Sequence, residues 1–225
     1  MLVINAKFDK NSTAKTADTL KSEIVDAITD YNKNTLTAFD GVFRYSKVTG
    51  LIDDVDNSIL SNITTVKIKK DFTPTINSST RYDVYFRNAI YNPHSGHEAV
   101  LSSTGFKISG NTNEMFLDDD GMGNVRVYYL VSGIKTVQNA TQGTIDYATG
   151  QITINSLDIA SISNIRGSIS TVIEVTASPL SNDVVPVRDQ ILEIDVSNSI
   201  VNVSEDTFIG GSSEAGVGYT TSSSY

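Results

Sequence analysis

The stretch ITTVKIKKDFTP, Ile63 to Pro74, marks the point at which the sequence changes its hydrophobic period. Val66 and Ile68 alternate with lysines, which is the two-residue period of a half-buried β-strand. Pro74 ends the predicted strand, because proline has no backbone N–H to give to a sheet. We expect the lysines of this stretch to lie on the solvent face of the strand. Helical periods precede this stretch, and short strands follow it.

Residues 1–73 predict a small α+β domain with the order strand, helix, helix, strand. Residues 1–8 have strand character, and Thr16 or Thr19 can cap the next helix by accepting a hydrogen bond from its first turn. Apolar residues at helical spacing give that helix one apolar face: Leu20, Ile24, Ala27, Ile28 and Tyr31. A second helix is predicted after Gly41, with an apolar face made by Val48, Leu51, Ile52 and Val55.

Residues 74–209 predict a β-rich domain with antiparallel hairpins, which makes the whole chain α+β. The clearest hairpin is GTIDYATGQITI, Gly143 to Ile154, in which Gly150 supplies a positive φ near the turn. Other strands are predicted at 82–86, 106–108, 115–117, 125–129, 169–175 and 191–196, with one short helical turn at 156–162. Residues 210–225 form a low-complexity C-terminal tail with too little apolar surface to fold alone.

Composition excludes several classes of site. The chain contains no cysteine, so it has no disulfide framework, thiolate metal site or cysteine nucleophile. No apolar run approaches the roughly 20 residues that span a bilayer. The net charge is −9: residues 1–110 carry 13 basic and 12 acidic residues (+1), and residues 111–225 carry 4 and 14 (−10). A basic stripe of the kind that binds nucleic acid is missing from the sequence, while the acidic half could meet a basic partner.

The acidic run DDDGMGN, Asp118 to Asn124, raises the question of a calcium loop. The spacing argues against one, because Met122 stands where a ligand is needed and no glutamate closes the loop at its twelfth position. We therefore expect a tight turn between two strands, in which aspartate and glycine serve the turn geometry.

Candidate catalytic residues are few. His94 and His97 lie beside Glu98 in a segment whose proline and glycine disfavour the helix of a metalloprotease motif, so a surface loop is expected. The pair Asp53-Asp54 is interpreted as solvated residues on a helix rather than as a general acid and base. Neither a G-x-S-x-G elbow nor a phosphate-binding glycine loop is present. The sequence therefore predicts no enzyme and no catalytic, cofactor-binding or metal site; a glycosidase or peptidoglycan hydrolase is a remote third class.

FRYSKVTGLIDDVDNSILSNITTVKIKKDFTP, Phe43 to Pro74, resembles the C-terminal region of baseplate wedge proteins of contractile-tailed, T4-like phages, of the baseplate J-like group. The family's helix pattern is matched by Ser46, Val48, Ile52, Asp53 and Val55, and its turn pattern by Ser58, Ile59 and Asn62. The hairpin at 143–154 and the segment 184–195 are similar to later parts of these proteins. Family members are much longer, so the chain is either a C-terminal piece or similar to them in part.

The resemblance implies a structural component of the virion, made in the host cytoplasm and located in the tail baseplate. Such proteins associate with a second copy of themselves and with other wedge proteins into a ring around the tail hub. The resemblance implies no cofactor, nucleic acid, membrane or small-molecule substrate.

The alternative is a β-rich carbohydrate- or surface-binding module of a tail fibre or cell-surface protein. Such modules often use exposed aromatic residues, and the chain has ten tyrosines. Tyr82, Tyr128 and Tyr147 fall at alternating strand positions, however, where packing explains them.

Overall fold

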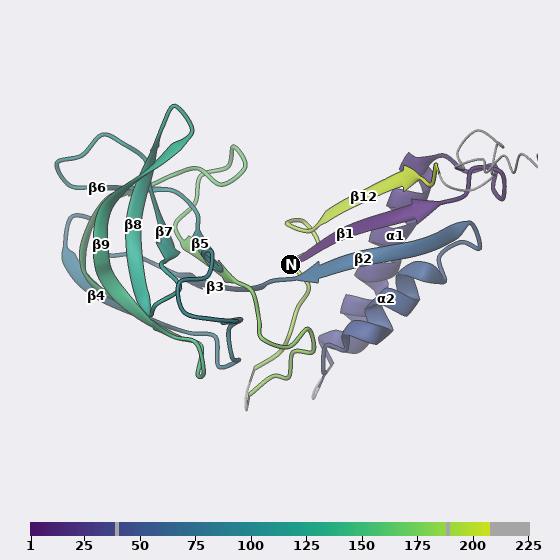
Figure 1. Cartoon of the computed structure of the whole chain (residues 1–225), viewed down its shortest axis with the longest axis horizontal. Helices are drawn as coiled ribbons and strands as arrows, with labels where there is room; N and C mark the ends of the chain where they lie inside the picture. The colour runs from purple at the N-terminus through teal and green to yellow at the C-terminus, as the bar shows by residue number, and fades with distance from the viewer. Residues whose placement is uncertain (39–40, 188–189, 208–225) are drawn as a thin grey trace, which may run out of the picture.

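The computed structural model describes residues 1–38, 41–187 and 190–207, and Figure 1 shows these residues gathered into two bodies. We call them the sheet–helix unit and the barrel unit. The tail predicted at 210–225 lies outside the described residues.

The sheet–helix unit is a three-stranded sheet with helices on one face (Figure 1). Its elements are β1 (Leu2–Phe8), α1 (Ala17–Tyr31), the π-helical segment η1 (Asn32–Leu36), α2 (Tyr45–Asp53), β2 (Ile59–Val66) and β12 (Ile200–Glu205). The strand order is β12-β1-β2; β1 is parallel to β12 and antiparallel to β2.

The first helix forms where the sequence predicts it. The Thr16 hydroxyl caps α1 by accepting a hydrogen bond from the Thr19 N–H at 3.2 Å. Leu20, Ile24 and Ile28 on its apolar face are buried, which confirms the predicted face.

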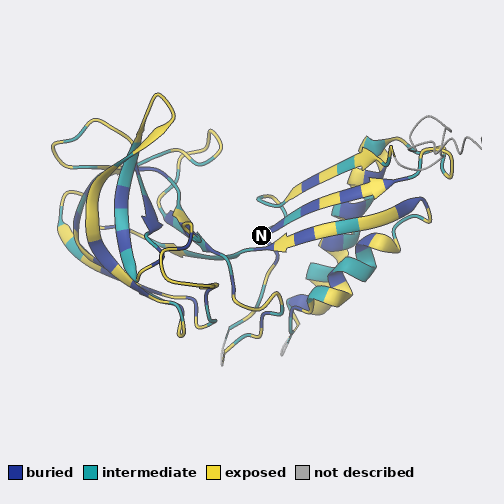
Figure 2. Ribbon diagram, viewed as in Figure 1, coloured by how far each residue is buried: buried dark blue, intermediate teal, exposed yellow. Residues whose placement is uncertain are grey.

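Strand β1 shows why the sheet has one covered and one bare face. Leu2, Ile4, Ala6 and Phe8 are buried beneath the helices, whereas Asn5 and Lys7 are exposed on the other face (Figure 2). Successive side chains of a strand point to opposite faces, so the two-residue period places the apolar residues under α1 and α2. The core of the unit lies between the sheet and the helices.

The barrel unit holds the remaining strands. They are β3 (Ile68–Phe72), β4 (Ser79–Tyr85), β5 (Leu101–Ser103), β6 (Phe106–Ile108), β7 (Met115–Asp119), β8 (Asn124–Val131), β9 (Ile134–Asp146), β10 (Gln151–Ile162) and β11 (Ile173–Ala177). Five strands close into a ring in the order β10-β6-β7-β8-β9, because β9 pairs back onto β10. Residues 151–154 of β10 pair with β9, and residues 159–162 pair with β6. The long strand β10 therefore closes the barrel.

The predicted hairpin at 143–154 is confirmed as the turn between β9 and β10. Asp146 pairs with Gln151 across the turn, and Gly150 has a φ of +69°. A Cβ at Gly150 would lie 2.2 Å from the Asn88 carbonyl oxygen, so this position requires glycine for space as well as for backbone conformation.

A second, smaller sheet completes the barrel unit. Its order is β3-β11-β5, and both of its pairings are antiparallel. Leu101, Ile173, Val175 and Ala177 from this sheet are buried in the same core as the barrel residues. The β-rich expectation for this part of the chain agrees with these two sheets, and the chain as a whole is consistent with α+β but mostly β.

The prediction of a single strand over Ile63–Phe72 is wrong, because two strands occupy this stretch. β2 ends at Val66 in the sheet of the sheet–helix unit, and β3 begins at Ile68 in the small sheet of the barrel unit. The alternation of side chains continues through Lys67, so the sequence pattern conceals the change of sheet.

Three other local predictions are also corrected. The strand expected at 169–175 is β11, Ile173–Ala177, and Ile169 is 90% exposed. Residues 156–162 continue β10 instead of forming a helical turn. Residues 191–196 form no strand; there the Ile194 N–H donates to the Asn32 side-chain oxygen at 2.7 Å, a contact distant in sequence.

The last strand was not expected and bears on the division of the chain. β12 pairs with β1, so residues 200–205 lie in the sheet–helix unit although they follow the barrel unit in sequence. The division at residues 73 and 209 remains a prediction, with this return of the chain added to it.

Candidate functional site: the junction between the two units

The chain passes between the units twice, and the first passage is the step from β2 to β3. At this step the Lys67 N–H donates to the Met1 carbonyl at 3.0 Å, and the Met1 amino group donates to the Lys67 carbonyl at 3.1 Å. Ile68, one residue further, contacts the hydrophobic cores of both units. Only Lys67 separates β2 from β3, so this connection allows the two units little movement relative to each other.

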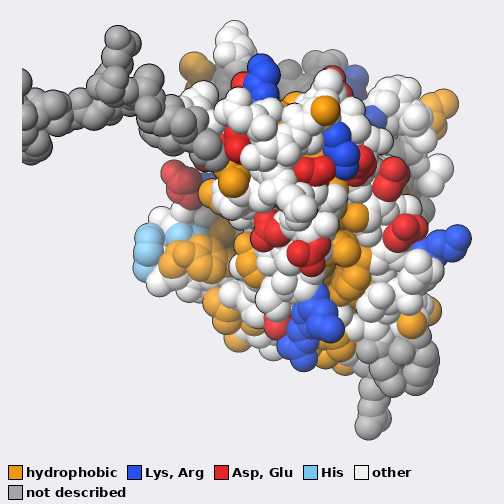
Figure 3. All heavy atoms as spheres, turned by 90° about the vertical axis from the view of Figure 1, so that its right-hand side faces the viewer, with side chains coloured by type: hydrophobic (Ala, Val, Ile, Leu, Met, Phe, Trp, Pro, Cys, Tyr) orange, Lys and Arg blue, Asp and Glu red, His pale blue; other side chains and the backbone are white. Residues whose placement is uncertain are grey.

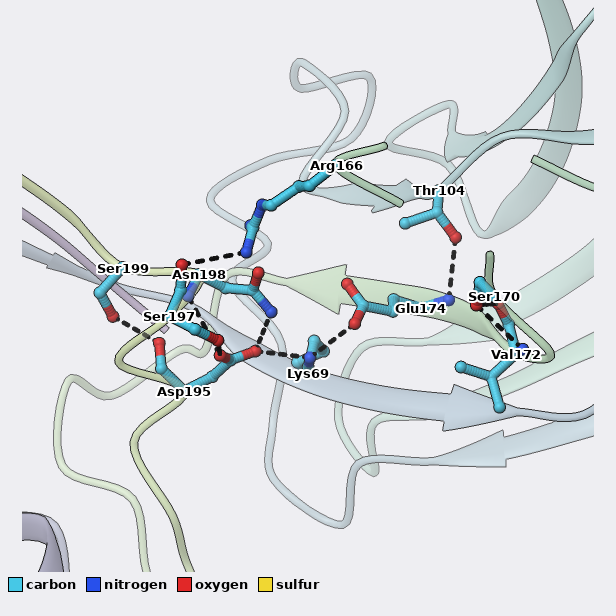
Figure 4. Close-up of polar contacts among 10 residues, drawn as sticks. All are labelled: Lys69, Thr104, Arg166, Ser170, Val172, Glu174, Asp195, Ser197, Asn198 and Ser199. Atoms are coloured by element: carbon cyan, nitrogen blue, oxygen red, sulfur yellow. Dashed lines mark hydrogen bonds and ion pairs between the residues drawn. The ribbon is translucent and has the colours of Figure 1, made fainter. Parts of the chain in front are cut away.

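Lys69 is the centre of the polar junction (Figure 4). Its ammonium lies 2.8 Å from Glu174 Oε1 on β11 and 2.5 Å from Asp195 Oδ2 on the returning segment. All three side chains are largely buried, with 16–19% of each exposed. The prediction that Lys69 lies on a solvent face is therefore wrong, because the returning segment covers that side of β3.

Asp195 organises the turn that leads the chain back to β1 (Figure 4). Its carboxylate accepts hydrogen bonds from the Ser197 hydroxyl at 2.8 Å, from the Asn198 N–H at 3.1 Å and from the Asn198 side-chain amide. Its carbonyl accepts from the Ser199 hydroxyl at 2.8 Å, and that hydroxyl in turn accepts from the Leu2 N–H at 2.9 Å. Asp195 thus joins β3 and the turn through its carboxylate, and the start of β1 through its carbonyl and Ser199.

Arg166 adds a contact from the barrel unit. Its guanidinium donates to the Ser197 carbonyl at 3.0 Å from a tight loop, as Figure 4 shows. The returning turn is therefore held by Arg166 as well as by Lys69.

The pKa values of the junction follow from this geometry. Burial alone would raise the pKa of Asp195, but hydrogen bonds from Lys69, Asn198 and Ser197 outweigh it and lower the pKa to about 2. Burial opposes the charge of Lys69, but its two carboxylate partners raise its pKa. Burial raises the pKa of the neighbouring Asp71 carboxyl. The shifts of Lys69 and Asp195 both favour the charged forms of this ion pair.

The second passage includes residues 178–187 and 190–199, and its first part contacts the start of α2. The Asp183 carboxylate accepts from the Tyr45 N–H at 2.8 Å and pairs with Arg44 at 2.8 Å. A carboxylate at a helix N-terminus satisfies a free N–H and favours the helix dipole. The adjacent residues Phe43 and Val184 form an isolated antiparallel bridge. The returning segment therefore supplies the cap that Arg44, the residue at the N-cap position, does not provide with its own side chain.

A cavity of about 860 Å³ lies at this junction. Leu36, Phe43 and Val66 line it from the sheet–helix unit, and Lys69 and Asp195 line its polar side. Apolar and charged groups meet here, so the relative position of the two units depends on both packing and ion pairs.

The structure places the predicted histidine segment against the barrel. Within it, the Gly96 N–H donates to the Gly121 carbonyl at 2.9 Å. His97 is only 7% exposed, with its ring 5.3 Å from that of Tyr147, so the surface-loop prediction is wrong for this residue. His94 is exposed, as expected. The two rings do not converge on a third metal-ligating side chain among the described residues.

The acidic run at 118–124 contains the predicted turn between β7 and β8, which occupies residues 120–123. Asp120 accepts from the Met122 N–H at 2.8 Å and from the Asn124 N–H at 3.0 Å, which is the aspartate turn geometry expected from the sequence. The hydrogen bonds that Asp120 accepts thus define the turn.

The two preceding aspartates are structural as well. Asp118 is 1% exposed and pairs with Arg126 at 2.8 Å and Lys135 at 2.6 Å. Asp119 accepts from the Tyr147 hydroxyl at 2.7 Å and from two backbone N–H groups of residues 100–101. Both carboxylates are already engaged by the protein's own donors.

Asp53, at the end of α2, accepts from the Asn62 side-chain amide at 2.7 Å. Asp53 thus ties α2 to β2, and Asp54 is exposed. Within the described ranges, no group of three histidine or acidic side chains could hold a metal ion, and no helix is long and apolar enough to cross a membrane. The predicted absence of catalytic, cofactor and metal sites remains a prediction.

Comparison with known proteins bears on the first part of the chain. Residues 2–71 resemble a baseplate domain. The matching family model is described as "Baseplate structural protein gp6, C-terminal domain III". The match covers β1, both helices, β2 and nearly all of β3, so it includes every element of the sheet–helix unit except β12 and extends past Lys69 on β3. No curated protein sequence matches the chain.

The baseplate match supports a structural role in a phage tail baseplate and the corresponding location in the virion. A structural role agrees with the charged residues described above, which stabilise turns, a helix cap and the junction. Figure 3 shows acidic and basic side chains interspersed with hydrophobic ones on the face that it presents.

Proposed function

We propose that this chain is a structural component of a phage baseplate wedge that associates with itself and with other wedge proteins, joining neighbouring wedges into a ring around the tail hub. The observation that carries the proposal is the match of residues 2–71 to a C-terminal domain of a baseplate structural protein. The proposed site of production is the host cytoplasm, and the proposed destination is the tail baseplate.

The junction suits such a role. A component of a ring has to hold its contact surfaces at a defined angle, and here two chain passages and a buried ion-pair cluster connect two bodies with separate cores. Preorganised contact surfaces lose less freedom on assembly than flexible ones, which favours association. A non-enzymatic role is part of this proposal.

Light scattering of the purified chain, followed by electron microscopy of mixtures with tail components, tests the proposal. We expect the chain to enter ring-shaped particles. We also expect a dimer at micromolar concentration, because an interface of standard size, which buries roughly 1,600 Å² in total, is stable. A strictly monomeric chain that never enters the particles would refute it.

One observation favours the alternative of a carbohydrate- or surface-binding module. On the barrel, the half-buried rings of Phe116 and Tyr128 stack 5.6 Å apart, and the Lys135 ammonium lies 4.2 Å from the Tyr128 ring centre. Stacked aromatic rings with a nearby polar group are a common sugar-binding surface. Saturable binding to one sugar class on a glycan array, lost in Tyr128→Ala, would support this function instead.

A further inference from the structure

Strand β12 is one of the two edge strands of the sheet–helix unit, and β2 is the other. β12 pairs with β1 on one side, and on its other side the described part of the chain places no strand (Figure 1). Unpaired edges present a row of N–H and C=O groups that can receive another strand. β12 is thus a template for strand addition.

The backbone groups that β12 turns outward follow from its parallel pairing. The Asp206 N–H donates to the Phe8 carbonyl at 2.9 Å, so this residue faces β1. Residues of a strand alternate in the side to which their backbone groups point, so Ser204 and Asn202 also face β1. The backbone groups of Val201 and Val203 therefore point away from the sheet.

From Ile200 to Ser204, the β12 edge lacks the devices that usually protect an edge from pairing; Glu205, its last residue, pairs with Lys10 at 2.9 Å. Residues Ile200 to Ser204, IVNVS, contain no charge and no proline, and the register with β1 runs without a bulge. The edge strand β4 carries Arg81 and Asp83, and the edge strand β3 carries residues 69–71, two lysines and an aspartate. β2, the other edge of the same sheet, is also uncharged from Ile59 to Val66, but its register with β1 shifts near Ile59. β12 is therefore an uncharged edge with a regular register, which suits it to receive a partner strand.

The flank of α1 beside this edge is also compatible with a second copy. Lys15 bridges Glu23 of α1 and Asp56 beyond α2, at 2.8 Å to each, so the acidic side of α1 is turned toward α2. Residues three and four apart share one side of a helix, and the opposite side carries the row Asp18, Lys21, Val25 and Thr29. This row holds one acidic and one basic residue, so two copies of α1 can approach without facing acidic rows.

We propose that β12 pairs antiparallel with β12 of a second copy, around a two-fold axis at Asn202, and continues two three-stranded sheets into one of six strands. This inference rests on the self-association proposed above and names the surface that carries it. Val201 then exchanges backbone hydrogen bonds with Val203 of the second copy, and the reverse pair follows from the symmetry.

A second copy fits this edge better than an unrelated strand for two reasons. In this register the side chains of Val201 and Val203 meet their counterparts on the helix-covered face and extend the two cores, where Val201 is already buried and Val203 is half-buried. The uncharged Ile200–Ser204 segment also brings no like charges together when it faces itself.

Engineered disulfides test the arrangement, because the chain contains no cysteine. Asn202 of each copy would meet at the axis as a non-hydrogen-bonded pair with Cα atoms about 4.5 Å apart, within reach of a disulfide. Asn5 is the matched control: it pairs with Asn202 on the same exposed face, but the two copies would be about 14 Å apart. We expect oxidised Asn202→Cys to run mostly as a covalent dimer and Asn5→Cys as a monomer.

Val203→Pro is the second variant, since it removes an outward N–H without removing a bond to β1. We expect it to convert the dimer to a monomer in light scattering with an unchanged far-UV circular dichroism spectrum. A wild-type dimer in which Asn202→Cys fails to cross-link, or Asn5→Cys cross-links equally, overturns β12 pairing while leaving self-association intact. A monomeric wild type overturns both proposals.

Discussion

The Lys69 ammonium lies 2.5 Å from Asp195 Oδ2, although 126 positions separate the two residues in sequence. Lys69 belongs to the first strand of the barrel unit, and Asp195 belongs to the turn that returns the chain to the sheet–helix unit. This one contact therefore joins both passages of the chain between the units. Its strength should affect how firmly the units are held together.

Lys69→Met should destabilise the junction. The change leaves Glu174 and Asp195 largely buried without their shared cation, and we expect a loss of about 2 kcal/mol in the free energy of unfolding. Urea denaturation measures the loss, and small-angle X-ray scattering should show a wider range of distances between the units. Lys70→Met, next to it on β3, is the control, for which we expect less than about 0.5 kcal/mol. Equal losses would contradict the role of Lys69.

The stability of the protein should depend on Asp195 at low pH. Its pKa in the folded state, about 2, lies below the value of about 3.9 in an unfolded chain. A lowered folded-state pKa gives stability that is present above about pH 4 and lost as the pH falls toward 2. Thermal melting of Asp195→Asn should therefore change less between these pH values than that of the wild type. Exposed Asp30→Asn on α1 should keep the wild-type slope.

Ile28→Ala should cost roughly 2–5 kcal/mol, because it removes methylene groups from a side chain that is 1% exposed and leaves a cavity. Ile63→Ala is the matched control, since Ile63 is 70% exposed on the bare face of the same sheet–helix unit. We expect it to change the unfolding free energy by less than about 0.5 kcal/mol. Chemical denaturation of both variants compares the two faces directly.

Gly150→Ala and Gly110→Ala should separate backbone strain from steric overlap. Both positions have positive φ, +69° and +78°, which costs a non-glycine residue about 1 kcal/mol. A Cβ at Gly110 meets open space, whereas at Gly150 it lies 2.2 Å from the Asn88 carbonyl oxygen. The melting temperature should fall by several degrees more for Gly150→Ala. Similar decreases in the melting temperatures of the two variants would show that the residues around Gly150 move easily to accommodate a Cβ.

Local patterns account for much of the fold that the sequence predicted. Thr16, the apolar row Leu20–Ile24–Ile28 and the Gly150 turn depend on neighbours within a few residues, so their period and turn chemistry are visible in the sequence. The turn at Asp120 is of the same kind. The strand limits at 173–177 were missed because residues 169–172 include the β-branched residues typical of a strand but have no neighbouring strand to pair with in the described structure.

The sequence by itself determined the helices, the hairpins and the absence of cysteine chemistry, because each is fixed by residue type and short-range spacing. Only the tertiary structure decided that the Ile63–Phe72 alternation serves two sheets, that Lys69 is largely buried between two carboxylates, and that residues 200–205 return to pair with β1. Strand pairing and ion pairing across more than 100 residues depend on which surfaces meet after the chain has folded. A two-residue hydrophobic period shows that a segment is a strand, but it does not specify its partner.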